Sequence, residues 1–342
     1  MAQQEVLVTG GSGFVAGHVV LRLLDEGHRV RTTVRSLRSA PGVRDALLDA
    51  GMTRGEELTF VEADLLDDGG WADAVAGTDA VLHVASPVRP GHVADEDEVI
   101  RPAREGTLRV LRAARDAGVR RVVLTSAFHA VGFGQPHDHG PFTEADWSPL
   151  DGEGVDAYGR SKILAERAAW DLAAEGNGPE LVALLPVAVL GPVLGGAVSG
   201  GNHVVQNLLR GAMPALPDLF IPIVDVRDVA LAHVAALRAE AVAGQRVLVS
   251  SGEPAVAMRD IALVLKAGLG RAAARVPTRR MPDVVVRASA RFRPELRSVA
   301  ADLGFVKEVD ITRMRTALGI EPRPAREAIL AAGRSLVANG LV

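Results

Sequence analysis

The chain contains no cysteine among its 342 residues. This absence excludes disulfide bridges, thiol nucleophiles and cysteine-ligated metal sites, and it fits a cytoplasmic protein. Aromatic residues make up only 4% of the sequence, and there is a single tyrosine. Lysine is also scarce, occurring at positions 162, 266 and 307 only, so arginine supplies nearly all of the positive charge.

No excess of one charge sign is present either. The formal net charge is −4, which gives no basic or acidic surplus of the kind that binds nucleic acid or a membrane surface. The arginine-rich segment 271–297 is offset by nearby acids and indicates solvated helix faces. The N-terminus lacks a basic region and an apolar signal-peptide core, so we interpret it as unprocessed.

One uncharged stretch, residues 181–201, resembles a membrane span in its lack of charge. It contains Pro186, Pro192 and many glycine, alanine and serine residues. This composition favours a buried strand followed by a Gly/Pro loop over a transmembrane helix.

Short β-rich runs alternate with longer helical patterns along the first half of the chain. Strands such as VVLT (122–125) show no alternation of apolar and polar residues, as expected when helices cover both faces of a sheet. The sequence therefore predicts an α/β protein with a Rossmann-type doubly wound parallel sheet. The expected strands are Glu5–Thr9, Arg29–Val34, Leu58–Glu62, Ala80–Val84, Arg121–Thr125 and Leu181–Val189, and the expected helices are Phe14–Asp25, Gly70–Val75, Glu96–Ala117 and Ala157–Ala174.

The pattern changes after about residue 190, where Gly- and Pro-rich loops appear. A strand is expected at Phe220–Val224 and another at Gln245–Ser250, followed by mostly helical segments. We expect residues 1–190 to form the Rossmann domain, rejoined by 225–250. Residues 191–342 then form mainly a smaller, mostly helical part that binds the substrate.

A glycine-rich turn follows the first expected strand. Residues 8–17 read VTGGSGFVAG, in which residues 11–16 fit the pattern G-x-G-x-x-G/A. Glycines let a diphosphate approach the bare backbone, and the N-terminus of the following helix offers free N–H donors. The position on the first strand–helix unit favours a dinucleotide over a tight turn without a ligand. The expected contacts come from Thr9, Gly10, Gly11, Ser12, Gly13, Phe14 and Val15.

The end of the second strand bears on which dinucleotide binds. NAD-binding versions carry an acid there that holds the ribose hydroxyls. Here the segment RTTVRSLRS (31–39) holds Arg35, with Arg38 close by and no acid. A guanidinium can bind a 2′-phosphate with two hydrogen bonds, so the sequence favours NADP(H). The alternative is that Arg35 is simply solvated.

The single tyrosine, Tyr158, stands four residues before Lys162. A random tyrosine would precede one of the three lysines at this spacing about once in a hundred tries. On a helix the two side chains share a face, and an ammonium there is expected to lower the phenol pKa from about 10 towards neutrality. The phenol can then donate a proton to the oxygen of a carbonyl group or accept one from an alcohol. The alternative is an ordinary surface contact.

These residues resemble the extended short-chain dehydrogenase/reductase family. Within it they are most similar to the branch of dihydroflavonol reductases, cinnamoyl-CoA reductases and microbial aldehyde/ketone reductases. The resemblance covers nearly the whole chain and rests on VTGGSGFVAG (8–17), VRTTVRS (30–36), VEADLLD (61–67), VLHVASPV (81–88), RRVVLTSA (120–127), AYGRSKILAERAAWD (157–171), LPVAVLGP (185–192) and VDVRDVALAH (224–233). It implies an NADP-dependent oxidoreductase in which Tyr158 is the acid/base and Lys162 its partner.

The resemblance also implies further contacts to the cofactor. Asp64 and Leu65 lie against the adenine, although a cap at the strand end is the alternative for Asp64. We expect Thr125 at the end of the fifth strand to face the cofactor side. The resemblance further assigns the ribose and diphosphate path to Val84, Ala85 and Ser86, and the nicotinamide amide to Pro186, Val187 and Val189.

The sequence departs from the family at one catalytic position. Relatives commonly read Thr-Ser-Ser at the end of the fifth strand, and the second serine helps to hold the substrate carbonyl. Here the run is Thr125-Ser126-Ala127, so the donor has to come from Ser126, Thr125 or His129. We favour Ser126, because a short hydroxyl mimics the usual donor and the chain can twist where the strand ends. Slow or absent carbonyl reduction is the other possibility.

The sequence thus predicts an NADPH-dependent reductase of an apolar or aromatic aldehyde or ketone. The expected pocket wall is Pro87, Phe128, Phe133, Leu194, Met213 and Phe220. One alternative is a nucleotide-sugar epimerase or dehydratase, or a hydroxysteroid dehydrogenase, of the same family. Against a sugar nucleotide, residues 190–209 hold no lysine or arginine for its phosphates. The other alternative is a non-catalytic NADP-binding regulatory protein, which Ala127 favours and the Tyr158–Lys162 pair disfavours.

The expected partner is a small-molecule carbonyl or alcohol substrate, with no nucleic acid and no membrane, and the protein is expected to be a monomer or a homodimer. The run His137-Asp138-His139 looks like a metal patch, but it lies on a Gly/Pro loop without an indicated fourth ligand. We interpret it as solvated and expect no metal.

Overall fold

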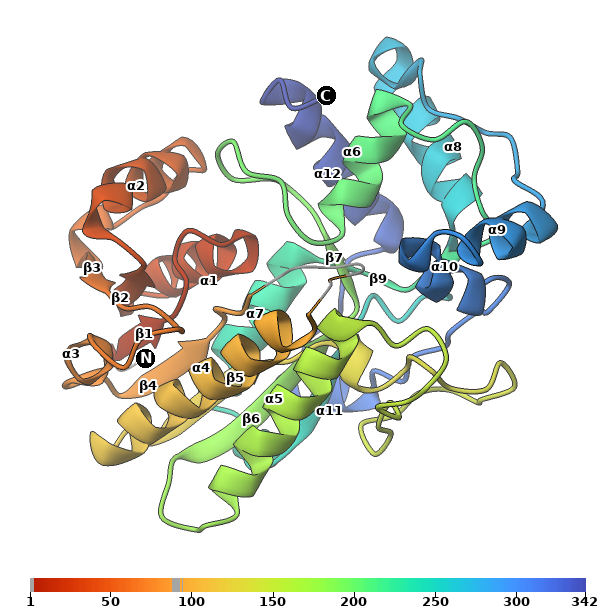
Figure 1. The fold of residues 1–342 in the computed structure, drawn as a ribbon. Helices are drawn as coiled ribbons and strands as arrows, with labels where there is room; N and C mark the ends of the chain where they lie inside the picture. The colour runs from red at the N-terminus through yellow and green to blue at the C-terminus, as the bar shows by residue number, and fades with distance from the viewer. Residues whose placement is uncertain (1–2, 88–92, 94) are drawn as a thin grey trace.

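A seven-stranded sheet forms the centre of the molecule (Figure 1). The structure is a computed structural model that describes residues 3–87, 93 and 95–342. The strand order is β10-β6-β5-β4-β1-β2-β3, and every neighbouring pair is parallel. This order, reversing at β1, confirms the predicted Rossmann-type doubly wound sheet. The strands are β1 Glu5–Val8, β2 Arg29–Val34, β3 Leu58–Glu62, β4 Ala80–His83, β5 Arg121–Thr125, β6 Glu180–Pro186 and β10 Arg246–Val249.

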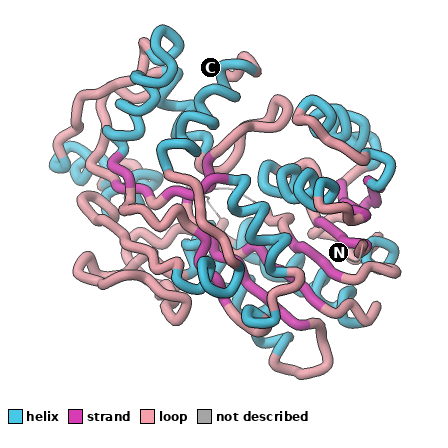
Figure 2. The backbone as a smooth tube through the Cα atoms, turned by 180° about the vertical axis from the view of Figure 1, so that it is seen from behind, coloured by secondary structure: helices cyan, strands magenta, loops and turns pink. Residues whose placement is uncertain are grey.

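Helices cover both faces of this sheet, and Figure 2 shows the strands between them from behind. The helices α1 (Phe14–Asp25) and α7 (Val226–Ala236) pack together on one face, and α4 (Asp97–Asp116) and α5 (Ala157–Ala173) pack together on the other. Parallel strands buried on both sides can be apolar at successive positions, which explains the missing alternation in β5.

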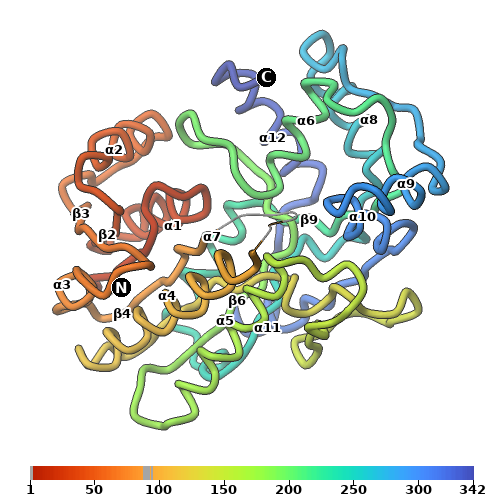
Figure 3. Tube along the Cα trace, in the orientation of Figure 1, coloured from red at the N-terminus to blue at the C-terminus, as the bar shows by residue number. Residues whose placement is uncertain are grey.

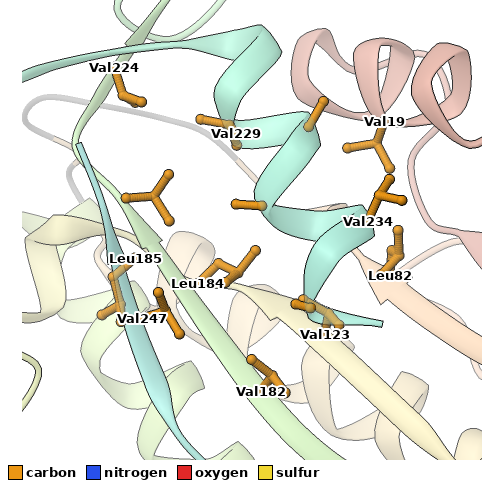
Figure 4. Close-up of a cluster of buried hydrophobic side chains, with 14 of the residues drawn as sticks. Val19, Leu82, Val123, Val182, Leu184, Leu185, Val224, Val229, Val234 and Val247 are labelled. Carbon is orange, nitrogen blue, oxygen red and sulfur yellow. The ribbon is translucent and has the colours of Figure 1, made fainter. Parts of the chain in front are cut away.

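The first face holds the largest core cluster. Val19 of α1 and Val234 of α7 pack with Leu82 of β4 and Val123 of β5 in this cluster, and all four are fully buried (Figure 4). Val81 and Val122, one residue earlier on the same strands, belong instead to the cluster under α4 and α5. This alternation of neighbouring residues between two faces is what a period of two along each strand dictates.

The C-terminal half lies beside the carboxyl end of the sheet (Figure 3), and its side chains form a second, smaller core cluster. Leu208, Leu265 and Leu336 from three different helices are fully buried in it. Two two-stranded sheets lie outside the central sheet: β7 (Ala188–Leu190) pairs in parallel with β9 (Ile223–Asp225), and β8 (Phe220–Ile221) pairs antiparallel with β11 (Val256–Ala257).

The remaining helices complete both parts. The α-helices are α2 Ala40–Asp49, α3 Trp71–Val75, α6 Asn202–Arg210, α8 Met258–Leu269, α9 Asp283–Ala290, α10 Arg297–Ala301, α11 Thr312–Leu318 and α12 Ala325–Ala338. Short 3₁₀ helices are η1 Leu37–Ser39, η2 Gly55–Glu57, η3 Phe128–Ala130, η4 Glu240–Val242, η5 Gly270–Ala273 and η6 Pro294–Leu296. Within the described residues, none of these helices has the length and apolarity needed to cross a membrane.

Two predicted strands are each divided in the structure. The strand expected at 181–189 ends at Pro186 and continues as β7, and the strand expected at 220–224 is interrupted at Pro222. Proline has no N–H, so it cannot donate to a sheet ladder. The strand expected at Gln245–Ser250 is present as β10 and returns to pair with β6. The division of the chain near residue 190 stays a prediction.

Candidate active site

The turn between β1 and α1 is closely packed and needs its glycines. Gly10 has a φ of +76°, and a Cβ atom there would lie 2.9 Å from the Cβ of Ala85. A Cβ atom on Gly11 would lie 2.8 Å from the Cγ2 of Thr32. The turn therefore exposes bare backbone to any ligand that lies over it.

The N-terminus of α1 is open. Gly13 precedes the helix without a side-chain cap, and the first turn contains no acidic residue. The backbone N–H groups of Phe14 and Val15 make no hydrogen bond to another backbone group in the described part of the chain. A helix end of this kind carries free donors and a partial positive charge, so the residues present fit a dinucleotide diphosphate.

A buried hydrogen-bond cluster fixes the neighbouring loop. The Thr9 hydroxyl accepts hydrogen bonds from the backbone N–H of Val84 (3.0 Å) and Ala85 (2.9 Å) and lies 2.8 Å from His83 Nδ1. Burial lowers the pKa of His83 to about 3, so the ring is neutral and its Nδ1 accepts the Thr9 proton. Thr9 is fully buried. It therefore supports the surface at Val84, Ala85 and Ser86 instead of forming part of it.

The basic residues expected at the 2′-phosphate follow β2 directly. Arg35 and Arg38 are exposed, and neither guanidinium makes a hydrogen bond or ion pair with the residues described. The Gly11 N–H donates to the Thr33 carbonyl (2.9 Å), which holds the end of β2 against the glycine turn. Glu62, which sequence reasoning missed, accepts a hydrogen bond from the Leu37 N–H (3.0 Å) and fixes this loop. The pairing of β2 with β3 places it there.

Asp64 and Leu65 form the turn after β3. The Asp64 carboxylate accepts a hydrogen bond from the Leu66 N–H (3.0 Å), so it closes its own turn and does not cap a helix. Leu65 packs on α4, where a Cβ atom on Gly106 would lie 2.8 Å from its Cβ. Their contact with adenine stays a prediction.

The proton-handling pair lies at the start of α5. Asp156 caps the helix by accepting a hydrogen bond from the Gly159 N–H (2.8 Å). Tyr158 lies in the first turn, and the Lys162 Nζ one turn later is 5.9 Å from the centre of its ring. The ammonium also donates to the Thr125 carbonyl (3.4 Å), which ties α5 to the end of β5. The phenol hydroxyl makes no hydrogen bond with any described residue.

The electrostatics of this pair differ from the expectation. Burial raises the pKa of Tyr158 to about 12, and the nearby Asp156 carboxylate adds to the effect. Burial lowers the pKa of Lys162 to about 8, against the opposing effect of Glu166. The predicted lowering of the phenol pKa is therefore wrong, because the effect of burial outweighs that of an ammonium at this distance. The phenol keeps its proton at neutral pH.

The structure corrects the role expected of Ser126. Its hydroxyl donates to the Glu166 carboxylate (2.6 Å), and this carboxylate also pairs with the buried Arg246 (2.7 Å). A hydroxyl has one proton, so in this arrangement Ser126 cannot donate to a substrate. Sequence reasoning missed Glu166, although it stands four residues after Lys162 on the same helix. Nothing in the sequence around Arg246 indicated that this residue lies beside Ser126 and Glu166.

The Thr125 hydroxyl is also engaged in a hydrogen bond within the protein. Its hydroxyl lies 2.7 Å from His233 Nε2, and the opposite ring nitrogen lies 2.8 Å from the Val229 carbonyl. Burial lowers the pKa of His233 to about 4, so the neutral ring donates to Val229 and accepts from Thr125. Thr125 thus contributes its carbonyl to the Lys162 side of the site and its hydroxyl to α7.

The segment expected at the nicotinamide joins the two parts of the molecule. Pro186 pairs with Val249 of β10, the Val187 N–H donates to the Val249 carbonyl (3.1 Å), and Val189 pairs with Val224 of β9. This places a buried apolar segment at the carboxyl end of β6, where ligands of such sheets bind. The nicotinamide contacts themselves stay a prediction.

The expected pocket wall is divided between different regions. Phe128 is 2% exposed and packs edge-on against Phe142, with ring centres 5.4 Å apart, so it belongs to the core. Leu194 lies against α1 at Gly17, and Met213 packs on the second core. Phe133 stacks on His129, with ring centres 4.1 Å apart, and His129 in turn contacts the Tyr158 ring.

The histidines of the run 137–139 take part in packing. His137 stacks on Phe305 (4.5 Å between ring centres), and His139 stacks on Phe142 (4.3 Å). Among the residues that the structure describes, no group of three or more histidine or acidic side chains is arranged to hold a metal ion.

Known proteins are similar to this chain in sequence and in fold. The sequence pattern of the NAD dependent epimerase/dehydratase family matches residues 6–250. Cinnamoyl-CoA reductase 1 of Arabidopsis thaliana is 37% identical over 253 residues, covering 73% of this chain and 71% of that protein. Tetraketide alpha-pyrone reductase 1 of the same plant is 37% identical over 257 residues, covering 73% and 77%. The yeast methylglyoxal/isovaleraldehyde reductase Gre2, solved with NADPH, superposes with a TM-score of 0.79 at 26% identity, covering 99% of this chain and 100% of that one.

Proposed function

Because the chain belongs to the NAD dependent epimerase/dehydratase family, we propose that it is an NADPH-dependent reductase of aldehydes or ketones. The observation that carries the proposal is the neutral, unpartnered phenol of Tyr158 with Lys162 behind it, beside an open glycine turn. The reductase names of two similar plant proteins, and the NADPH in the Gre2 structure, support the same activity.

The described residues at the carboxyl ends of the sheet strands fit NADPH. The diphosphate would lie at the N-terminus of α1 beside Gly10 and Gly11, and the 2′-phosphate would lie between Arg35 and Arg38. When bound, NADPH supplies the hydride for the carbonyl carbon. Orientation of the substrate and delivery of the proton are left to the protein.

Tyr158 performs the proton transfer in this proposal. Its phenol is protonated at neutral pH and donates that proton to the oxygen of the carbonyl as negative charge develops there. The Lys162 ammonium, held by the Thr125 carbonyl and charged below a pKa of about 8, stabilises the phenolate that remains. Solvent then returns the proton to Tyr158.

The test is NADPH oxidation by the purified protein over a panel of aliphatic and aromatic aldehydes and ketones. We expect turnover with an apolar or aromatic carbonyl compound. Tyr158→Phe should keep NADPH affinity and lose about 10²-fold or more in turnover, because it removes only the proton. A Phe variant with full activity would show that the proton comes from another group.

The same assay separates the other members of the family. Conversion of a nucleotide sugar without net NADPH oxidation would identify an epimerase or dehydratase. Tight NADPH binding without oxidation by any carbonyl compound would identify a regulatory protein.

A further inference from the structure

The imidazole of His129 lies directly against the phenol ring of Tyr158. The two ring centres are 4.9 Å apart and the planes meet at 80°. His129 belongs to η3, which begins three residues after the end of β5, so the strand end carries the ring to the start of α5. The imidazole is therefore a neighbour of the reacting group.

Stacking holds this imidazole in one orientation. The ring of Phe133 lies parallel to it, with centres 4.1 Å apart and planes 6° apart. The Lys307 Nζ lies 4.6 Å from the centre of the Phe133 ring and pairs with Asp302 at 2.6 Å. Because Lys307 is itself buried, this wall is fixed before any substrate arrives.

The ring nitrogens of His129 are uncommitted. Neither makes a hydrogen bond with any residue that the structure describes. The two hydroxyl donors at the end of β5 are engaged, Ser126 with Glu166 and Thr125 with His233, and the Lys162 ammonium donates one of its three N–H groups to the Thr125 carbonyl. Ala127 has no donor at all. Besides the Lys162 ammonium, the His129 imidazole is thus the described side chain next to the Tyr158 ring that can offer an N–H to a ligand.

The charge state of the His129 ring allows it to donate a hydrogen bond. Burial lowers the pKa of His129 to about 4; Lys307 and Lys162 act in the same direction, and Asp156 and Asp302 act against it. At neutral pH the ring is uncharged and carries one N–H donor and one acceptor nitrogen.

We propose that the His129 imidazole donates a hydrogen bond to the carbonyl oxygen of the substrate, as the second donor beside Tyr158. This inference rests on the proposed reductase function. The carbonyl oxygen becomes negative as the carbon is reduced, and a second donor oriented in advance stabilises that charge. The neutral imidazole gives up no proton in this role, so the transferred proton still comes from Tyr158.

The first test measures binding without turnover. Benzamide presents a carbonyl oxygen, but its amide carbon does not accept hydride from NADPH. Its affinity for the NADPH-saturated protein is measured by calorimetry. We expect His129→Ala to weaken binding about 3- to 10-fold, as for the loss of one hydrogen bond, and His129→Gln to retain most of the affinity because its amide also donates.

The chain offers a matched control for this test. His139 stacks on Phe142 with ring centres 4.3 Å and planes 7° apart, so it repeats the stacking geometry of His129, but its ring has no contact with Tyr158. His139→Ala should leave benzamide affinity unchanged. Equal affinity of the parent and His129→Ala, or no benzamide binding by the parent, would overturn the proposal.

The second test uses the carbonyl substrate that the parent protein reduces fastest. His129→Ala should lose about 10²–10³-fold in kcat while NADPH affinity stays the same, and adding Ala127→Ser should restore part of the rate by supplying a hydroxyl donor nearby. Full activity of His129→Ala overturns the role of His129 and leaves the reductase function intact. If the unsubstituted protein reduces no carbonyl compound, the proposed reductase function is wrong. The benzamide measurement then still decides whether His129 donates a hydrogen bond to a carbonyl oxygen.

Discussion

At the scale of single residues, we propose that the guanidinium groups of Arg35 and Arg38 decide cofactor choice. Arg35 follows β2 and is free of protein partners among the described residues, so Arg35→Ala should remove the proposed contact to the 2′-phosphate without disturbing the fold. We expect NADPH binding to weaken by about 1.5–3 kcal/mol, roughly tenfold to a hundredfold, and NADH binding to stay unchanged. Fluorescence titration with both cofactors measures this.

Arg29 provides the control for this prediction. It lies at the amino end of the same strand, far from Arg35, and pairs with Glu5 at 3.1 Å. Arg29→Ala should change neither affinity. An equal loss of NADPH and NADH affinity in Arg35→Ala would mean that Arg35 stabilises the loop and does not select the cofactor.

Single residues also show where sequence reasoning about the site ends. Tyr158 and Lys162 were predictable because both the pairing and the spacing lie within one helix. The direction of the Ser126 hydroxyl was not, because it depends on Glu166, 40 residues later, and on Arg246 beyond it. The prediction of a lowered phenol pKa was wrong for the same reason. The i,i+4 spacing describes one helix, whereas the burial that raises the pKa of Tyr158 comes from the whole fold.

At the scale of elements, the β1–α1 turn carries the next prediction. In Gly11→Ala the new methyl group would lie 2.8 Å from the Thr32 Cγ2, so the strand or the turn has to shift. We expect the free energy of unfolding to fall by about 1–3 kcal/mol, with a loss of NADPH affinity. Urea denaturation with and without NADPH measures both effects.

Gly42→Ala is the matched control for this substitution. Gly42 lies within α2, and a Cβ atom there has no neighbour within 4 Å. Alanine is the better helix former, so this variant should be neutral or up to about 1 kcal/mol more stable. If Gly11→Ala behaves in the same way, the close packing of the turn is unimportant.

Among the elements, the sheet strands were the easiest to predict and α2 was missed. Strands buried on both faces leave long apolar runs bounded by turn residues, which local sequence shows directly. The helix α2 buries Leu47 alone and starts with a proline and a glycine in its first turn, so it has almost no periodic apolar face to detect. Its place is set by contact with the strand layer beside it and not by its own pattern.

At the scale of the whole molecule, buried neutral histidines predict sensitivity to acid. Burial lowers the pKa of His83 to about 3 and the pKa values of His129 and His233 to about 4. In the unfolded chain each returns to about 6.5, so the unfolded state binds more protons between about pH 4 and 6.5. The free energy of unfolding should therefore be highest above pH 6.5 and decrease as the pH falls to 4.

Urea denaturation at several pH values across this window tests the prediction. His233→Gln removes one of the three groups, so unfolding should take up about one proton fewer and the pH dependence should flatten. The control is His203→Gln on α6, outside this set of buried histidines, which should leave the slope unchanged. A parent protein whose stability is constant from pH 7 to 4.5 would contradict the assignment.

The scarcity of tyrosine has a practical consequence for the whole molecule. Because the only phenol in the chain is the one at the candidate reaction centre, the near-ultraviolet absorbance of phenolate reports a single oxygen atom. An alkaline titration of the unlabelled protein then follows the local electric potential at Tyr158, with an expected midpoint of about 12 in the free protein. Each ligand or distant substitution that moves this midpoint therefore reveals how it changes the electric potential at the Tyr158 oxygen.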